Sequence, residues 1–241
     1  MKPMFSVLFL SCVLALGLVG CRSAVNEESK TENANSSVTT NNSNKAEPEA
    51  AKSNTSSNGD SYRISASGSQ FTAKVPVGGL LASLGHDHTI AIRDFTGEAH
   101  VTPGTIEPAS LQLTIKAGSL AEAEKGISES DRQKINSSIQ EEALETSKYP
   151  QIVFKSTNVS AKKTGEGQYH VQINGNLTLH GVTRPIAIPA QVTLKGNTLI
   201  ARGQFTVRHS DYQIKRLSAG AGTVKAKEEI TLSFSVVGSK V

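Results

Sequence analysis

The sequence predicts an all-β protein, an antiparallel β-barrel of about eight strands with one helix between the third and fourth strands. Apolar and polar side chains alternate along most segments, as in strands with one covered face. This alternation excludes an all-parallel sheet, whose strands are apolar on both faces, and leaves a sandwich or a closed barrel. Evenly spaced strands with mostly short links favour a meander, and closure removes its exposed edges.

The clearest strands form a pair joined by a corner at residues 180–185. Apolar residues share one parity from Tyr169 to Leu179 and again from Ile186 to Leu194, so each strand carries one apolar face. The same reasoning places six further strands within the following ranges: 62–75, 86–101, 109–117, 151–160, 198–208 and 227–237.

The second of these strands contains a parity switch. Before the switch the apolar residues Ile90 and Ile92 lie at even-numbered positions, whereas after it Phe95 and Val101 lie at odd-numbered positions. One extra residue reconciles the two runs, so the switch predicts a β-bulge near Arg93 and Asp94.

The helix is expected over residues 128–146. Ser128 and Asp131 form a weak capping box, and Ile135, Ile139 and Ala143 recur at helical spacing. The proline at position 150 bars its continuation.

In a simple up-and-down order, the long links gather at one rim and the short links at the other. The residues on the inward parity at the rim with the long links are predicted to form a polar collar around the mouth of an apolar barrel: His86, His88, Arg184 and His209. The arginine would suit a phosphate or a quinone oxygen.

Two alternatives concern these positions and the interior. Histidines at i and i+2 on a strand share a face, so His86 and His88, with His209, could form a three-histidine metal site. Cupins bind a metal with such a histidine pair and a glutamate a few residues further on. This sequence lacks that glutamate, so a metal site is not the favoured interpretation. The small residues Gly175, Ala190, Ala201 and Gly203 either leave space for a ligand or fit the taper of a filled barrel.

The chain begins with a secretory signal pattern, a lysine and then a short apolar run over residues 5–20. Leu18-Val19-Gly20-Cys21 resembles a bacterial lipobox, which implies a signal peptide over residues 1–20 and a lipidated Cys21. Residues 21–60 are rich in Asn, Ser and Thr and are expected to be a disordered tether, with the barrel over residues 61–241.

Composition narrows the function. The net charge is +4 and aromatic residues are 5% without tryptophan, and the basic residues are scattered, which disfavours nucleic-acid binding. The sequence has no Gly-x-Ser-x-Gly elbow, no Gly-rich phosphate loop and, with Cys21 lipidated, no free thiol, so we expect no enzyme activity.

Several ordered motifs resemble the YceI-like family of bacterial envelope proteins that bind polyisoprenoids. They are the early segment 83–97, Asp131-Arg132 with the segment 148–156, the corner segment 175–185 and the segment 205–212. The resemblance covers residues 62–237 and implies an extended lipocalin-like barrel around a long apolar chain. One departure is Ile-Gln-Glu-Glu-Ala at 139–143, where the family usually carries an aromatic pair.

The function expected from this resemblance is sequestration of an isoprenoid or similar amphiphile in the cell envelope, at a periplasmic or outer-membrane face if the cell has two membranes. The ligand would be a polyisoprenoid, an isoprenoid quinone or another long-chain lipid, with no required cofactor. The partner would be the membrane, through Cys21, and a homodimer is left open. A structural envelope lipoprotein with a filled core is the other alternative. The residues predicted to line the ligand-binding wall are Phe154, Ile173, Leu177, Leu179, Ile188, Val192, Phe205 and Phe234.

Overall fold

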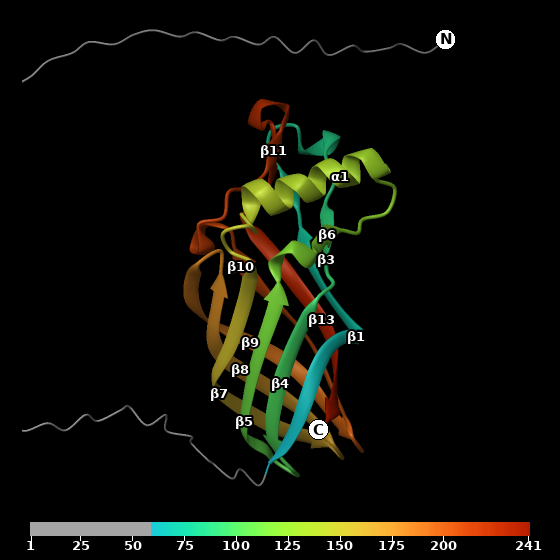
Figure 1. Ribbon diagram of the computed structural model, residues 1–241, viewed down its shortest axis with the longest axis vertical. Coiled ribbons are helices and arrows are strands. Elements are labelled where there is room, and N and C mark those ends of the chain that lie inside the picture. Colours follow the sequence, from blue (N-terminus) through green and yellow to red (C-terminus); the bar gives the residue numbers. More distant parts are fainter. Residues whose placement is uncertain (1–58) are drawn as a thin grey trace, which may run out of the picture. The chain divides into compact units, whose positions relative to one another are not determined.

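The computed structural model describes residues 59–241, which form a closed antiparallel barrel (Figure 1). The signal peptide, Cys21 and almost all of the tether proposed above lie outside the described residues. Each of the eight barrel strands pairs with its two neighbours, and pairing of the first strand with the last closes the barrel. In chain order the barrel strands are β1 (Asp60–Val75), β4 (Phe95–Thr102), β5 (Ile106–Lys116), β7 (Gln151–Gly165), β8 (Gln168–Leu179), β9 (Val182–Lys195), β10 (Thr198–Arg208) and β13 (Glu229–Lys240).

The parity switch in the second strand coincides with a break between two separate strands, where the sequence predicted a β-bulge. The short strand β3 (His88–Ile92) precedes β4, and the two are separated at Arg93 and Asp94. The second half of β1 pairs with β3 and its first half with β4. The two strands therefore follow one another along the same neighbouring strand, β1. Ile90, Ile92 and Phe95 are all buried, because the break returns both parities to the interior.

The long connections lie at one rim, as predicted, but the link between β8 and β9 at that rim, expected to be one of the longer ones, is a two-residue turn. Two- and three-residue turns join β4 to β5, β7 to β8 and β9 to β10, and we call their rim the closed end. The other rim, the mouth end, carries the long connections and the tight turn between β8 and β9 (Figure 1). Additional short strands tie these connections together: β2 (Val77–Gly78), β6 (Leu120–Glu122), β11 (Ser218–Ala219) and β12 (Val224–Ala226).

The one α-helix of the described part of the chain, α1 (Glu129–Ser138), lies in the connection between β5 and β7, as predicted. Ser128 is its N-cap, and the Ser128 hydroxyl oxygen accepts a hydrogen bond from the Asp131 amide at 3.1 Å. The helix continues as a π-helical turn over Ile139–Ala143. No residue of α1 is buried, whereas Ile139 and Ala143 are, so the π-helical turn anchors this segment to the mouth end.

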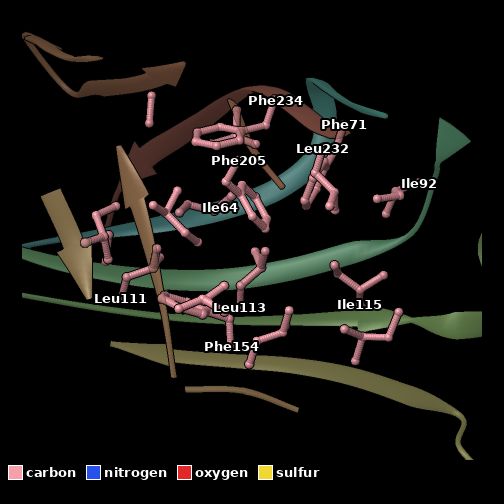
Figure 2. Close-up of a pocket in the computed structure, with 18 of the residues that line it drawn as sticks. Ile64, Phe71, Ile92, Leu111, Leu113, Ile115, Phe154, Phe205, Leu232 and Phe234 are labelled. Atoms are coloured by element: carbon pink, nitrogen blue, oxygen red, sulfur yellow. The ribbon is translucent and has the colours of Figure 1, made fainter. Parts of the chain in front are cut away.

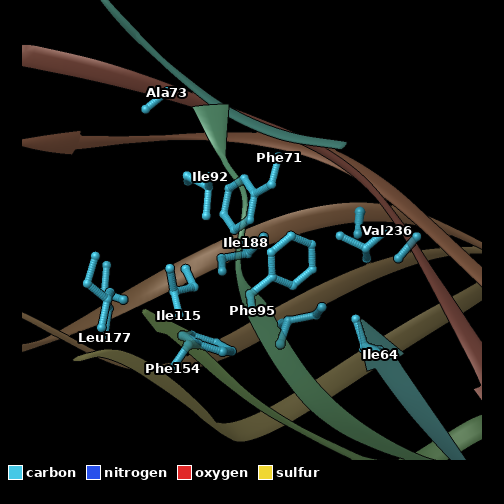
Figure 3. Packing of buried hydrophobic residues seen from close by; sticks show 14 of the residues in the cluster. Ile64, Phe71, Ala73, Ile92, Phe95, Ile115, Phe154, Leu177, Ile188 and Val236 are labelled. Atoms are coloured by element: carbon cyan, nitrogen blue, oxygen red, sulfur yellow. The ribbon is translucent and has the colours of Figure 1, made fainter. Parts of the chain in front are cut away.

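The core is the inner face of the barrel, as strand alternation requires. Aromatic rings from different strands meet there: the rings of Phe71 and Phe95 pack edge to face with centroids 5.9 Å apart (Figure 3). At the closed end the buried Tyr169 donates a hydrogen bond through its hydroxyl to the Gly104 carbonyl at 3.0 Å. Among the described residues, no helix is long and apolar enough to cross a membrane.

Candidate functional site

The barrel encloses an apolar cavity of about 190 Å³, here called the barrel cavity. Ser110 is the one polar residue among those that line it. Figure 2 shows Leu113 and Phe154 facing Phe205 and Phe234 across this space. All eight residues predicted for the wall line the cavity, namely Phe154, Ile173, Leu177, Leu179, Ile188, Val192, Phe205 and Phe234. Their contact with a ligand stays a prediction.

A second cavity of about 340 Å³ lies toward the mouth end, and we call it the mouth cavity. It is lined by α1, the π-helical turn and the segment from His209 to Ala226, and its lining includes histidine, lysine and serine side chains. The two cavities adjoin, because five residues line both of them: Ala73, Leu120, Leu144, Ile214 and Ile230. The interior therefore passes from a chamber with a single polar residue in its lining to one with several.

Small residues in the barrel wall are covered by aromatic rings. A Cβ atom on Gly175 would lie 2.5 Å from the Phe154 ring, and one on Gly203 would lie 2.5 Å from the Phe234 ring. These two glycines therefore make room for rings of neighbouring strands, which occupy part of the space, while the buried Ala201 lines the barrel cavity directly. For these two glycines, the ring contacts favour the filled-barrel alternative over space left for a ligand.

The four residues of the predicted collar all lie at the mouth end, but only two face the interior. His88 and His209 line the mouth cavity. His86 and Arg184 are exposed, so the prediction that all four point inward is wrong for these two. His86 precedes the first residue of β3, where strand alternation does not apply, and Arg184 reaches outward at the rim to donate from Nε to the Asp211 carbonyl at 3.1 Å.

His88 is paired with a carboxylate that sequence reasoning missed. Glu122, at the end of β6, is fully buried, and its Oε2 lies 2.6 Å from Nδ1 of His88. Its other oxygen accepts a hydrogen bond from the Glu124 amide at 2.7 Å. Arg132 of α1 donates to the backbone carbonyls of Glu122 and Glu124 at 2.7 and 3.0 Å. The pair thus joins β3, β6 and α1 beside the mouth cavity.

His209 is 6% exposed and donates from Nδ1 to the Glu228 carbonyl at 3.1 Å. Burial lowers the pKa of His209 below its usual range, although the Glu228 backbone and carboxylate act in the opposite direction. His209 is therefore a neutral imidazole at pH 7, with the second ring nitrogen able to accept a hydrogen bond.

The turn between β8 and β9 also holds neighbouring connections together. His180 has a φ of 51°, and its Nε2 lies 2.7 Å from a Glu145 carboxylate oxygen while Nδ1 lies 3.1 Å from the Tyr212 carbonyl oxygen. The Tyr149 ring packs on the imidazole with a centroid separation of 4.5 Å. His180 therefore links three connections at the mouth end, a role that parity could not reveal because the residue lies in a turn.

The alternative metal site is not assembled. Across residues 59–241, no group of three or more His, Cys, Asp or Glu side chains is placed to hold a metal ion. The rings of His86 and His88 lie 4.7 Å apart, and His209 is not grouped with them.

These features define a lipocalin-like class of protein, a closed eight-stranded antiparallel barrel with an apolar interior and a polar mouth. The chain belongs to the YceI-like domain family, whose model matches residues 62–238.

Curated relatives match part of the chain. A UPF0312 protein of Shewanella baltica is 32% identical over 123 residues, which are 48% of this chain and 56% of the relative. A UPF0312 protein of Yersinia pestis is 34% identical over 100 residues, 41% of this chain and 49% of the relative. The chain thus spans about half the length of the curated relatives it matches.

Solved structures support the fold. BcnA of Burkholderia cenocepacia is 19% identical with a TM-score of 0.55, over 72% of this chain and 98% of BcnA. A polyisoprenoid binding domain from Saccharophagus degradans, implicated in plant cell wall breakdown, is 16% identical with a TM-score of 0.53, over 75% of this chain and 98% of that domain. At these identities the similarity concerns the fold alone.

Proposed function

We propose that the barrel binds and sequesters one long-chain isoprenoid or similar amphiphilic lipid in the bacterial cell envelope. The apolar barrel cavity, continuous in its lining with the larger mouth cavity, is the observation that carries the proposal. The tail would occupy the barrel cavity and the head group the mouth cavity. The ligand named for the Saccharophagus degradans domain is consistent with this class of lipid.

The driving force would be burial of the tail, about 0.8 kcal/mol for each CH₂ group before association costs. A tail segment enclosed by Phe154, Phe205 and Phe234 loses contact with water on all sides. The volumes of the two cavities together fall within the roughly 300–1,000 Å³ of typical ligand sites. A lipid longer than this space would extend through the mouth.

The head group would meet the side chains that line the mouth cavity. Neutral His209 can accept a hydrogen bond, and Lys225 provides positive charge in the same lining. Such a lining suits a polar group with oxygen acceptors and a hydroxyl or amide donor. Binding of this kind needs no bond-making step and no cofactor, and export with lipidation at Cys21 would keep the protein at a membrane.

The test is extraction of the purified full-length protein with organic solvent, followed by mass spectrometry. We expect one long-chain lipid for each protein molecule. In the variant Ala201→Phe a ring would fill the barrel cavity and reduce the co-purified lipid at least fivefold, because Ala201 is buried in its lining. The matched control is Ala187→Phe on the exposed face of β9, which should retain the lipid.

Two results would contradict the proposal. One is wild-type protein without co-purifying lipid that also takes up no added prenyl chain, which would favour a structural protein with a filled core. The other is equal lipid in both variants. Thermal unfolding of each variant distinguishes loss of binding from loss of the fold.

A further inference from the structure

The mouth end terminates in a tip built from two uncharged segments, residues 76–85 and 217–224. Neither contains an Asp, Glu, Lys or Arg, although charged residues make up 19% of the chain. Pairing of β2 with β12 and a hydrogen bond from the Leu81 amide to the Thr223 carbonyl at 3.0 Å join the two segments. Figure 1 shows this tip beyond α1, at the end of the molecule away from the C-terminus.

Three leucines of the tip are exposed. Leu80 is 88% exposed, Leu84 is 77% exposed and Leu81 is 40% exposed. Among the large apolar residues of the described chain, the only other exposed one is Val241, at 62%. A single exposed leucine needs no explanation, but three on one loop make an apolar patch that marks an interaction surface.

The loop that carries the leucines is firmly packed. Gly79 has a φ of 104°, and a Cβ atom there would lie 2.4 Å from the Thr223 carbonyl oxygen. A Cβ atom on Gly85 would lie within 2.9 Å of the Val77 and Val224 side chains. Both glycines allow the loop to pack against β12, so the leucines project from a preformed surface.

The border of the tip is positively charged. Lys225 and Lys227 follow the second segment, and neither takes part in an ion pair among residues 59–241. The nearby Asp87 is engaged by Lys74 at 3.4 Å. Asp87 also interacts electrostatically with Lys227, whereas no carboxylate among residues 59–241 forms an ion pair with Lys225. An uncharged apolar projection bordered by lysines is complementary to an anionic lipid surface, where the side chains enter the acyl region and the ammonium groups remain at the phosphates.

We infer that this tip docks into the surface of an anionic lipid bilayer. Leu80, Leu81 and Leu84 would enter the bilayer, and Lys225 and Lys227 would lie at the head groups. The mouth cavity would then lie next to the membrane, because Val77, Val224 and Lys225 belong to its lining. The inference goes beyond binding inside the barrel and does not depend on which lipid the barrel carries.

The test uses the full-length chain with an environment-sensitive fluorophore on a cysteine, either Leu84→Cys or the control Val241→Cys near the opposite end of the barrel. Vesicles contain phosphatidylcholine and phosphatidylglycerol. With vesicles, we expect a blue shift at position 84 and quenching by a nitroxide on the lipid chains, and neither change at position 241. Any anchor at Cys21 is common to both variants, and labelled wild type gives the background, so anchoring alone cannot produce the difference.

Lys225→Gln with Lys227→Gln, in the Leu84→Cys background, should weaken the response at least threefold on these vesicles. An unchanged response would overturn the assigned role of charge. No blue shift at position 84, or the same shift at both positions, would overturn docking. A shift that grows with protein concentration in the absence of vesicles would instead identify a second copy of the chain as the occupant. None of these readouts needs a ligand in the barrel, so docking and lipid sequestration can fail separately.

Discussion

The closed end and the mouth end of this barrel hold their connections in place by different contacts. At the closed end short turns join the strands, and the buried Tyr169 reaches a backbone carbonyl of one of these turns. At the mouth end a fully buried Glu122 and a nearly buried His209 lie beside a cavity. At the closed end polar side chains, among them the Lys240–Asp60 ion pair at 2.7 Å, support short turns and paired strands, whereas at the mouth end buried polar side chains hold long connections in place.

The His88–Glu122 pair is the sharpest test of this contrast. His88→Ala would leave the Glu122 carboxylate buried without its imidazole partner, which should lower the free energy of unfolding by about 3 kcal/mol. The estimate is at the low end for buried pairs because the His88 side chain is 30% exposed. Urea denaturation measures the loss.

The control for this prediction is His86→Ala, two residues away and exposed, which should change stability by less than about 0.5 kcal/mol. Adding Glu122→Gln to His88→Ala should recover part of the loss, because a neutral amide is less costly to bury without a partner. Equal effects of the two histidine substitutions would show that the mouth end does not depend on this pair.

The next largest effect concerns packing in the barrel wall. Gly203→Ala would place a Cβ atom 2.4 Å from the Pro189 carbonyl oxygen and 2.5 Å from the Phe234 ring. Either the strands or the ring must move, which should cost about 2 kcal/mol in urea denaturation. Gly118→Ala is the matched control, since no atom lies within 4 Å of its Cβ position. If Gly203→Ala left the free energy of unfolding unchanged, the barrel wall would be able to shift and accommodate the added methyl group.

Strand alternation predicted the barrel strands because each of them has one buried face. The boundaries of β10 at Thr198 and Arg208 and the break at Arg93 and Asp94 agree with the parity counts. Alternation could not predict β2, β6, β11 or β12, which have only two or three residues each. Such strands form because the long connections meet at one rim, which is a property of the closed barrel.

The residues of the candidate site could be predicted from the sequence to a similar extent. Parity identified the apolar lining correctly, since inward positions of a barrel converge on the same interior. It failed for Arg184, where the barrel rim allows an inward position to reach solvent. It gave no signal for Glu122 or His180, whose roles come from contacts between connections far apart in sequence.

A smaller effect is expected from the titration of His209. Its pKa in the folded protein is lowered by burial, so the unfolded state, with a pKa near 6.5, takes up the proton first as the pH falls. Stability should therefore be full above about pH 7 and decrease below about 6.5, by at most about 1.4 kcal/mol per pH unit, until the folded pKa is reached. Urea denaturation between about pH 7.5 and 5 measures this slope.

His209→Asn should flatten the slope in that range, while retaining a donor for the Glu228 carbonyl. The exposed His170, changed to Asn, should leave the slope as in the wild type. If the His209 variant keeps the full slope, another group at the mouth end controls the response to pH.

The smallest effect is expected in α1. It tests whether the helix at the mouth end can unfold locally while the barrel strands stay paired. The helix fully buries none of its own residues. It is held by the Ser128 cap, by the bonds from Arg132, by the Asn136 side chain, which accepts from the Glu122 amide at 2.8 Å, and by Ile135, which packs half-buried against the core. Ser128→Ala should destabilise the helix by about 1 kcal/mol. Hydrogen exchange of the α1 amides should then be about fivefold faster, with unchanged exchange in β8 and β9, because local opening leaves the barrel strands paired. Equal acceleration in helix and strands would mean that α1 opens only when the whole barrel unfolds, and the distinction between the two ends would then not extend to their dynamics.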